Sequence, residues 1–94
     1  MADAIQEMIV FTRVVGAGSL SAAARELDLS PALISRKLAA LESRLGVRLI
    51  NRTTRSLRLT DEGANYHESC ARVLAEIDEA EAAITAGRVE PRGR

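Results

Sequence analysis

The residues best suited to chemistry lie in the stretch SPALISRKLAALESRLG, which runs from Ser30 to Gly46. Read as a helix, its first turns carry small or hydroxyl side chains beside two cations, Arg36 and Lys37. A helix with a slim, positively charged N-terminal half can enter a DNA major groove, about 12 Å wide, and hydrogen-bond the edges of the bases. An amphipathic core helix with solvated cations has the same composition, so the flanking segments have to distinguish the two.

Signals that begin and end a helix surround this stretch. Ser30 is a good N-cap because its hydroxyl can accept from a backbone N–H one turn later, and Pro31 suits the first helical position. Gly46 supplies the left-handed residue that ends the helix. Apolar residues at spacings of 4, 3 and 4 predict a single buried stripe, formed by Ile34, Leu38, Leu41 and Leu45.

The segment before Ser30 is interpreted as two further helices. The first covers about residues 3–15, and its apolar side is formed by Ile5, Met8, Ile9, Thr12 and Val15, widened by Phe11 and Val14. Ser19 or Ser21 can cap the second, SAAARELD, whose alanines favour close packing. Only a tight turn fits between it and Ser30. Two helices joined in this way, the second with an exposed basic N-terminal half, are typical of a helix-turn-helix.

The sequence then changes to a period of two. Two short apolar segments, residues 47–50 and 57–60, flank the polar run NRTTRS, which predicts a small β-hairpin. The residues expected to face the core are Leu49, Leu57 and Leu59. Arg52 and Arg55 then lie at the tip of the hairpin, where arginine suits a narrow, A·T-rich minor groove. A solvent-exposed basic loop is the simpler alternative.

A long helix is predicted over residues 61–87, capped by Thr60, with Gly63 tolerated in its first turn. Its apolar seam has heptad spacing and comprises Tyr66, Cys70, Val73, Ile77, Ala80 and Ile84, widened by Leu74. So small a domain cannot cover the whole seam, so we expect the same helix of a second copy to pack there. The alternative is that the seam lies on the first helix of its own chain. Residues 88–94 are predicted to be a disordered tail.

The zero net charge of the 94 residues averages two opposite parts. Residues 1–60 carry nine cations and five acids, whereas residues 61–94 carry four arginines and eight acids. Between Arg36 and Arg58 there are seven cations, and Glu42 is the only acid. Such a cluster is expected of a phosphate-binding surface, because a solvated face usually interleaves the two signs.

Several function classes find no support in the composition. Cys70 is the only cysteine and His67 the only histidine, so we expect no intrachain disulfide, no metal site and no catalytic constellation. The two aromatic residues have core-like spacings, which leaves no stacking platform for single strands. No apolar run approaches the about 20 residues that span a bilayer. We therefore expect a soluble, cytoplasmic protein that is not an enzyme and needs no cofactor.

These motifs together resemble the N-terminal DNA-binding domain and linker helix of the LysR-type transcriptional regulators. The matching segments are FTRVVGAGSLSAAARELDLS (residues 11–30), SPALISRKLAALESRLGVRLINRTTRSLRLTDEG (residues 30–63) and the long helix that follows. The resemblance implies a winged helix-turn-helix that forms a homodimer through its linker helices and binds a roughly two-fold symmetric DNA site. Whole members also carry a C-terminal effector-binding domain. None is present in this sequence, which is either a fragment of a longer regulator or a stand-alone protein.

The resemblance also implies roles for single residues. The family's base-contacting positions fall on Pro31, Ala32, Ser35 and Arg36, and its wing arginine falls on Arg55. Many members have Gln-Pro where this chain has Pro31-Ala32. The base hydrogen bonds of that glutamine are therefore missing. Part of the recognition of base sequence must come instead from Arg36, from apolar contact with a thymine methyl, or from DNA shape.

Arg36 is predicted to donate to guanine O6 and N7, Ser35 to a base or phosphate, and Lys37 to hold a phosphate. The segment 52–54 is expected to position the hairpin on the DNA backbone while Arg55 enters the minor groove. The full predicted DNA-binding set is Ser30, Pro31, Ala32, Ser35, Arg36, Lys37, Arg52, Thr53, Thr54 and Arg55.

The predicted fold is mostly α-helical with a small β-hairpin: a winged helix-turn-helix domain (1–60), a linker and dimerisation helix (61–87) and a disordered tail (88–94). The predicted function is sequence-specific binding of double-stranded DNA by a homodimer in transcriptional regulation, with no small-molecule effector and no membrane as partner. The alternative is a protein-interaction module that uses the acidic face of the long helix, formed by Glu76, Asp78, Glu79 and Glu81. A Cys70–Cys70 bridge between two copies is a further, redox-based hypothesis.

Overall fold

The computed structural model describes residues 2–52 and 57–89. These residues form helices α1 (Ala2–Ala17), α2 (Leu20–Leu27) and α3 (Pro31–Leu45), strands β1 (Ile50–Arg52) and β2 (Leu57–Leu59), and helix α4 (Asp61–Val89). The predicted order of three helices, a hairpin and a long helix is confirmed.

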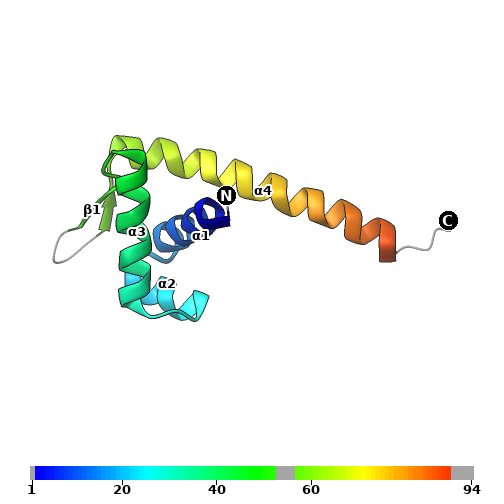
Figure 1. Cartoon of the computed structure of the whole chain (residues 1–94), viewed down its shortest axis with the longest axis horizontal. Helices are drawn as coiled ribbons and strands as arrows, with labels where there is room; N and C mark the ends of the chain where they lie inside the picture. The colour runs from blue at the N-terminus through cyan, green and yellow to red at the C-terminus, as the bar shows by residue number, and fades with distance from the viewer. Residues whose placement is uncertain (1, 53–56, 90–94) are drawn as a thin grey trace.

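Helices α1, α2 and α3 form a small head from which α4 extends (Figure 1). The hairpin lies beside α3, on the side away from α1, and α4 begins next to the hairpin (Figure 1). Because α1 contacts α2, α3 and α4, it is the central helix of the head. This arrangement places α3 and the hairpin at one end of the molecule and the C-terminal half of α4 at the other.

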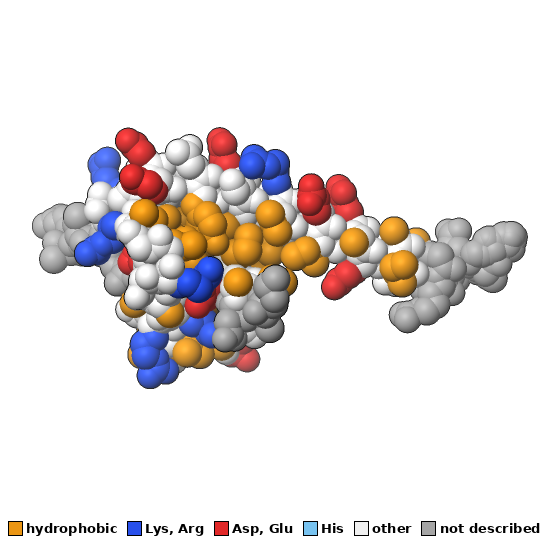
Figure 2. Space-filling view, turned by 45° about the horizontal axis from the view of Figure 1, so that its top comes forward, with side chains coloured by type: hydrophobic (Ala, Val, Ile, Leu, Met, Phe, Trp, Pro, Cys, Tyr) orange, Lys and Arg blue, Asp and Glu red, His pale blue; other side chains and the backbone are white. Residues whose placement is uncertain are grey.

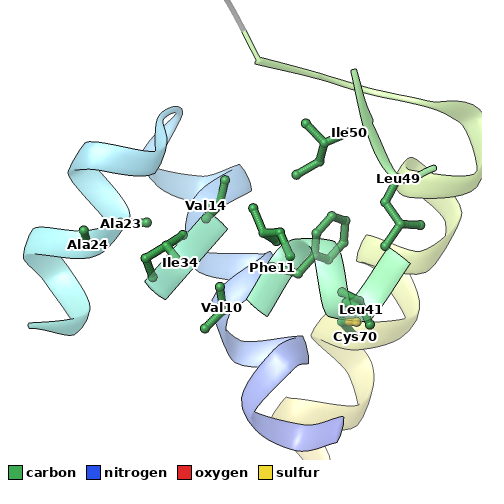
Figure 3. Close-up of a cluster of buried hydrophobic side chains, with 11 residues drawn as sticks. Val10, Phe11, Val14, Ala23, Ala24, Ile34, Leu41, Leu49, Ile50 and Cys70 are labelled. Carbon is green, nitrogen blue, oxygen red and sulfur yellow. The ribbon is translucent and has the colours of Figure 1, made fainter. Parts of the chain in front are cut away.

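The core lies where α1, α2, α3, the hairpin and α4 meet (Figure 3). Its buried hydrophobic residues are Val10, Phe11, Val14, Ala23, Ala24, Ile34, Leu38, Leu41, Leu49, Ile50 and Cys70. The predicted inner side of α1 is rotated by part of a turn, because Val10, Phe11 and Val14 are the most deeply buried whereas Ile5 is 38% exposed. In α3 the predicted stripe is buried up to Leu41, and its last member, Leu45, is exposed.

Side-chain caps define both helices of the helix-turn-helix. The hydroxyl of Ser19 accepts from the Ala22 N–H at 3.1 Å, so Ser19 rather than Ser21 caps α2. The hydroxyl of Ser30 accepts from the Leu33 N–H at 3.1 Å and caps α3, as predicted. Each cap satisfies one backbone donor that the first turn of a helix leaves without a partner.

The turn between α2 and α3 has left-handed backbone at Asp28, with φ of 59°. The next residue, Leu29, donates its N–H to the carbonyl oxygen of Ala24 at 2.9 Å, which closes the C-terminal end of α2. Two other helix ends differ from the prediction: α1 continues through Gly16, and α4 continues through Gly87 to Val89. Glycine is tolerated inside a helix when neighbouring residues favour helix, although it costs about 1 kcal/mol relative to alanine.

The hairpin is a two-stranded antiparallel sheet with the pairs Ile50–Leu59, Asn51–Arg58 and Arg52–Leu57. Leu49 is buried, and Leu57 and Leu59 are half-buried against the core, as expected. Ile50 is buried as well. The predicted tip residues 53–56 lie outside the described ranges.

Gly63, in the first turn of α4, is required there rather than merely tolerated. A Cβ added at this position would overlap the carbonyl oxygen of Leu49. Thr60 caps the same helix end, because its Oγ1 accepts from the Gly63 N–H at 2.9 Å. The same Oγ1 donates to the carbonyl oxygen of Arg48 at 2.6 Å. The start of α4 and the base of the hairpin therefore pack as one unit.

The seam predicted on α4 divides into two parts, the first of which packs on the head. Cys70 is fully buried, and the ring of Tyr66 lies 5.6 Å from the ring of Phe11, centroid to centroid. The prediction of an intermolecular contact by Cys70 is wrong, because the chain's own core covers it. For this part of the seam the alternative, packing against α1, is correct.

The second part of the seam extends beyond the head. Val73 is 40% exposed and Ile84 is 70% exposed, while Leu74 and Ile77 are half-buried. None of the helices in the described ranges is both long and apolar enough to cross a membrane.

Candidate nucleic-acid interface

Helix α3 has one anchored face and one exposed face. Three of its apolar residues are buried in the core: Ile34, Leu38 and Leu41. Toward its N-terminus Pro31, Ala32 and Arg36 are exposed, and Ser35 is half-buried. The predicted base-contacting positions therefore share the N-terminal half of one helix, and only Ser35 among them is partly covered by the chain.

The two predicted cations of α3 differ in their surroundings. Arg36 is exposed and makes no hydrogen bond or ion pair with any residue in the described ranges. Lys37 is half-buried, and its Nζ donates to Oε1 of Gln6 on α1 at 3.4 Å. Arg36 is thus available to an external acceptor. Lys37 can bind such an acceptor only by giving up, or adding to, its hydrogen bond with Gln6.

Arg44, in the last turn of α3, does not belong to the free basic surface. Its Nη2 and Nε donate to Oε1 of Glu7 on α1 at 2.7 and 3.1 Å. This hydrogen bond raises the pKa of the Arg44 guanidinium. The pair instead joins the C-terminal end of α3 to α1.

The described residues include only part of the hairpin that was predicted to contact DNA. Thr53, Thr54 and Arg55 lie outside the described ranges, as does the side chain of Arg52. On the described strands Asn51 and Arg58 form a cross-strand pair and are both exposed. Arg58, which the predicted DNA-binding set lacks, therefore adds a cation to the outer surface of the hairpin.

Glu42 is the residue whose role sequence reasoning missed. One carboxylate oxygen, Oε2, accepts from the N–H groups of Leu49 and Ile50 at 2.8 and 3.1 Å. The only acid within a run of seven cations is thus engaged by the backbone of the hairpin. Its isolation in the basic stretch is the one signal in the sequence that could have drawn attention to it.

The outer part of α4 carries the second candidate surface. A groove of about 470 Å³ separates it from α1, lined by Ile5, Ile9, Thr12, Arg13, Leu74, Ile77, Asp78 and Glu81. Hydrophobic side chains continue from the head along α4 (Figure 2). Of the predicted dimerisation residues beyond Cys70, Val73, Ala80 and Ile84 are exposed and the other two are half-buried.

Cys70 is unsuited to a bridge between two copies. Its side chain has no exposed surface, and burial raises the pKa of the thiol. A thiol in such surroundings stays protonated at neutral pH, and the protonated form is not the reactive species. The structure therefore does not support the redox hypothesis.

The sequence matches known proteins over nearly its whole length. The family model of bacterial regulatory helix-turn-helix proteins of the LysR family matches residues 5–64. An HTH-type transcriptional regulator of Xanthomonas campestris pv. campestris (strain 8004) is 45% identical over 93 residues, which are 99% of this chain and 27% of that protein. An HTH-type transcriptional repressor of Pseudomonas aeruginosa (strain UCBPP-PA14) is 46% identical over 92 residues, which are 98% of this chain and 29% of that protein. The chain thus spans less than a third of the length of these curated relatives.

The fold also matches solved structures. A complex of the CbnR DNA-binding domain with DNA aligns with a TM-score of 0.82 and 32% identity, covering 89% of this chain and 97% of that chain. The LysR-type transcriptional regulator CrgA from Neisseria meningitidis aligns with a TM-score of 0.75 and 44% identity, covering 88% of this chain and 28% of that chain. Both relatives named above are transcriptional regulators, and neither is named as an enzyme.

Proposed function

The chain belongs to the LysR family of bacterial regulatory helix-turn-helix proteins, and we propose that it binds double-stranded DNA sequence-specifically, as a homodimer, in transcriptional regulation. The observation that carries the proposal is the division of α3 into two faces. Ile34, Leu38 and Leu41 fix the helix to the core, while Arg36 projects without a partner in the described ranges. A helix held in this way can lie in a major groove without exposing its apolar side.

Within this proposal each predicted DNA-binding residue has a role. Arg36 donates to guanine O6 and N7, and Ser35 donates to a base or a phosphate. Pro31 and Ala32 contribute apolar contact, for which a thymine methyl is the complementary group. Lys37 exchanges its bond to Gln6 for a phosphate oxygen.

The remaining contacts position the protein on the DNA backbone. Ser30 caps α3 and places the positive end of that helix toward a phosphate. Arg52, Thr53 and Thr54 contact the backbone, and Arg55 enters the minor groove. The CbnR DNA-binding domain, whose fold this chain shares, was solved as a complex with DNA.

The proposed dimer forms through α4, within the segment 61–87. Val73, Leu74, Ile77, Ala80 and Ile84 supply the contact, whereas Cys70 is covered by the chain's own core and Tyr66 is half-buried against that core. An apolar side chain as exposed as Ile84 gains about 1.5–3 kcal/mol when it is fully removed from water. The winged helix-turn-helix of residues 1–60 then binds one half-site in each copy.

The family membership favours DNA binding over the alternative of a protein-interaction module built on the acidic face of α4. Bacterial DNA lies in the cytoplasm, so the proposed function implies a cytoplasmic protein. The whole relatives extend well beyond the segment that this chain matches, and the proposal concerns DNA binding by that segment.

The experiment that tests the proposal is selection of bound duplexes from a random pool by the 94-residue chain. We expect enrichment of two related half-sites with a fixed separation, because a symmetric dimer imposes its own geometry on the site. Recovery of single half-sites would contradict the dimer alone. Failure to enrich any sequence would contradict sequence-specific DNA binding and leave the interaction module as the better explanation.

A further inference from the structure

Besides the apolar packing of Leu49 and Ile50 in the core, the hairpin is joined to α3 in the described ranges by hydrogen bonds to the side chain of Glu42. Its Oε2 accepts from the N–H of Leu49 at 2.8 Å and from the N–H of Ile50 at 3.1 Å. Hydrogen bonds to an ionised acceptor are about twice as strong as hydrogen bonds between neutral groups. These two bonds therefore hold the hairpin firmly against α3.

These two amides have particular need of an acceptor. The side chains of Leu49 and Ile50 are each 1% exposed, so the backbone between them lies against the protein core. A backbone N–H that is removed from water and lacks an acceptor costs about as much as a lost hydrogen bond. The carboxylate of Glu42 meets this need for both donors at once.

The opposite side of the hairpin base is attached to α4. Thr60 donates its N–H to the carbonyl oxygen of Leu49 at 3.0 Å, and its hydroxyl bonds the carbonyl oxygen of Arg48. Within residues 2–52 and 57–89 the sheet contains three residue pairs, and so short a ladder does little to fix its own direction. The hairpin base is therefore held between α3, through Glu42, and α4, through Thr60.

We propose that Glu42 is a positioning residue that fixes the angle of the hairpin relative to α3, so that one bound protein reads two adjacent parts of its DNA site. This inference rests on the proposed function. It makes a specific prediction: the base pairs read by α3 do not depend on Glu42, whereas the outer base pairs reached by the hairpin do. A carboxylate that faced the DNA would instead repel phosphates, and its loss would strengthen binding to every sequence.

The test compares Glu42→Ala with Glu68→Ala, which makes the same change at an exposed position of α4 with no partner in the described ranges. Duplexes are selected from a random pool by the wild-type chain and by both variants. The positions at which Arg36→Ala relaxes base preference mark the base pairs read by α3. In parallel, amide hydrogen exchange is measured at Leu49 and Ile50.

For Glu42→Ala we expect the rate of amide exchange at Leu49 and Ile50 to rise about tenfold. This factor corresponds to the hydrogen-bond free energy lost when a charged acceptor is removed. Discrimination at the outer base pairs is expected to fall by about threefold or more, with the pairs read by α3 unchanged. Glu68→Ala should match the wild type in both measurements. Because Glu42→Ala can also unfold the head, Glu42→Gln is measured beside it. The glutamine keeps a neutral acceptor, and intermediate values of both quantities are expected.

Two results would overturn the positioning role. One is an unchanged base preference in the folded Glu42 variants. The other is a loss of discrimination that is equal at the inner and outer base pairs, which indicates general destabilisation. If the wild-type chain itself enriches no sequence, the proposed function fails first. Enrichment by the wild type with an unaltered Glu42→Ala profile contradicts this inference alone.

Discussion

The head of the molecule and the outer part of α4 differ in how fully the chain buries its own apolar side chains. In the head, apolar residues of α1, α3 and the hairpin are buried together, and Ser19, Ser30, Glu42 and Thr60 satisfy backbone groups at the ends of the elements. On the part of α4 that follows Cys70, the apolar residues Val73 and Ile84 are exposed. The head therefore has a buried core of its own, with Ile5, Leu45 and Val47 exposed at its surface, whereas Ile84 on α4 is far more exposed and is left for the proposed dimer to cover.

The same contrast separates the two surfaces that the protein offers to partners. The exposed face of α3 is cationic and lies on a helix anchored from behind, which suits a rigid, charged ligand such as duplex DNA. The surface along α4 is apolar with flanking acids (Figure 2). A surface of this kind suits another protein chain, and the heptad spacing indicates a helical one.

The largest effect is expected at the junction of the two regions. Gly63→Ala forces a methyl group into the carbonyl oxygen of Leu49 and should destabilise the chain by about 3 kcal/mol, the upper range for overpacking. The measurement is urea denaturation followed by circular dichroism. Gly16→Ala is the matched control, because apart from the neighbouring backbone of its own helix nothing lies within 4 Å of its added Cβ. That control should raise stability slightly through helix propensity. Equal stability of the two variants would mean that α4 does not pack on the hairpin base as described.

The next effect concerns the outer half of α4. Ile84→Ser should weaken self-association by about 2 kcal/mol, close to the transfer free energy of a buried isoleucine, while leaving the unfolding of the head unchanged. Sedimentation equilibrium measures the dimer dissociation constant. Ala82→Ser, on the same exposed turn, is the control. If both variants associate like the wild type, Ile84 is not part of the dimer contact.

A comparable or smaller effect is expected at the exposed face of α3. Arg36→Ala should cost about 1–3 kcal/mol on the selected duplex and relax preference at one base pair. Binding is measured by fluorescence anisotropy on the selected duplex and on random DNA. Arg72→Ala removes the same charge from α4 and should have little effect on preference. An equal loss on both DNAs would refute base readout by Arg36 and reduce it to a phosphate contact.

The smallest effect is expected for Lys37→Ala. A residue that holds a phosphate weakens binding to all sequences alike and lowers the slope of affinity against salt by about 1. Because Lys37 is partly engaged by Gln6, the change in affinity should be smaller than that of Arg36→Ala. Titrations at several salt concentrations measure the slope. A change in base preference would instead place Lys37 on a base edge.

Features that depend on neighbouring residues in the sequence could be predicted. Ser30, Pro31 and Gly46 carry local signals, and they mark the two ends of α3 as the structure has them. The hairpin likewise follows from alternation on both sides of a polar turn. Such features need no knowledge of how the chain packs, which is why residue type and spacing are sufficient.

Features that depend on packing could not be predicted. Gly63 looks like a weak helix residue until the carbonyl oxygen of Leu49 is placed beside it. Glu42 looks like a solvated acid, because nothing in the spacing indicates that it bonds the backbone of Leu49 and Ile50. Cys70 fits an intermolecular seam by spacing alone, and only the position of α1 shows that the seam is divided. In each case the deciding contact comes from a different element of the fold.

The proposed function requires that α3 and the hairpin present a surface that recognises duplex DNA by sequence. The most direct test is titration of the wild-type chain against its selected duplex and a scrambled duplex of equal composition, at two salt concentrations. The proposed function predicts tight binding of the selected duplex, steep loss of affinity with salt on both, and a discrimination that persists at the higher concentration. Binding that is equal for the two duplexes, or absent at both concentrations, would contradict it.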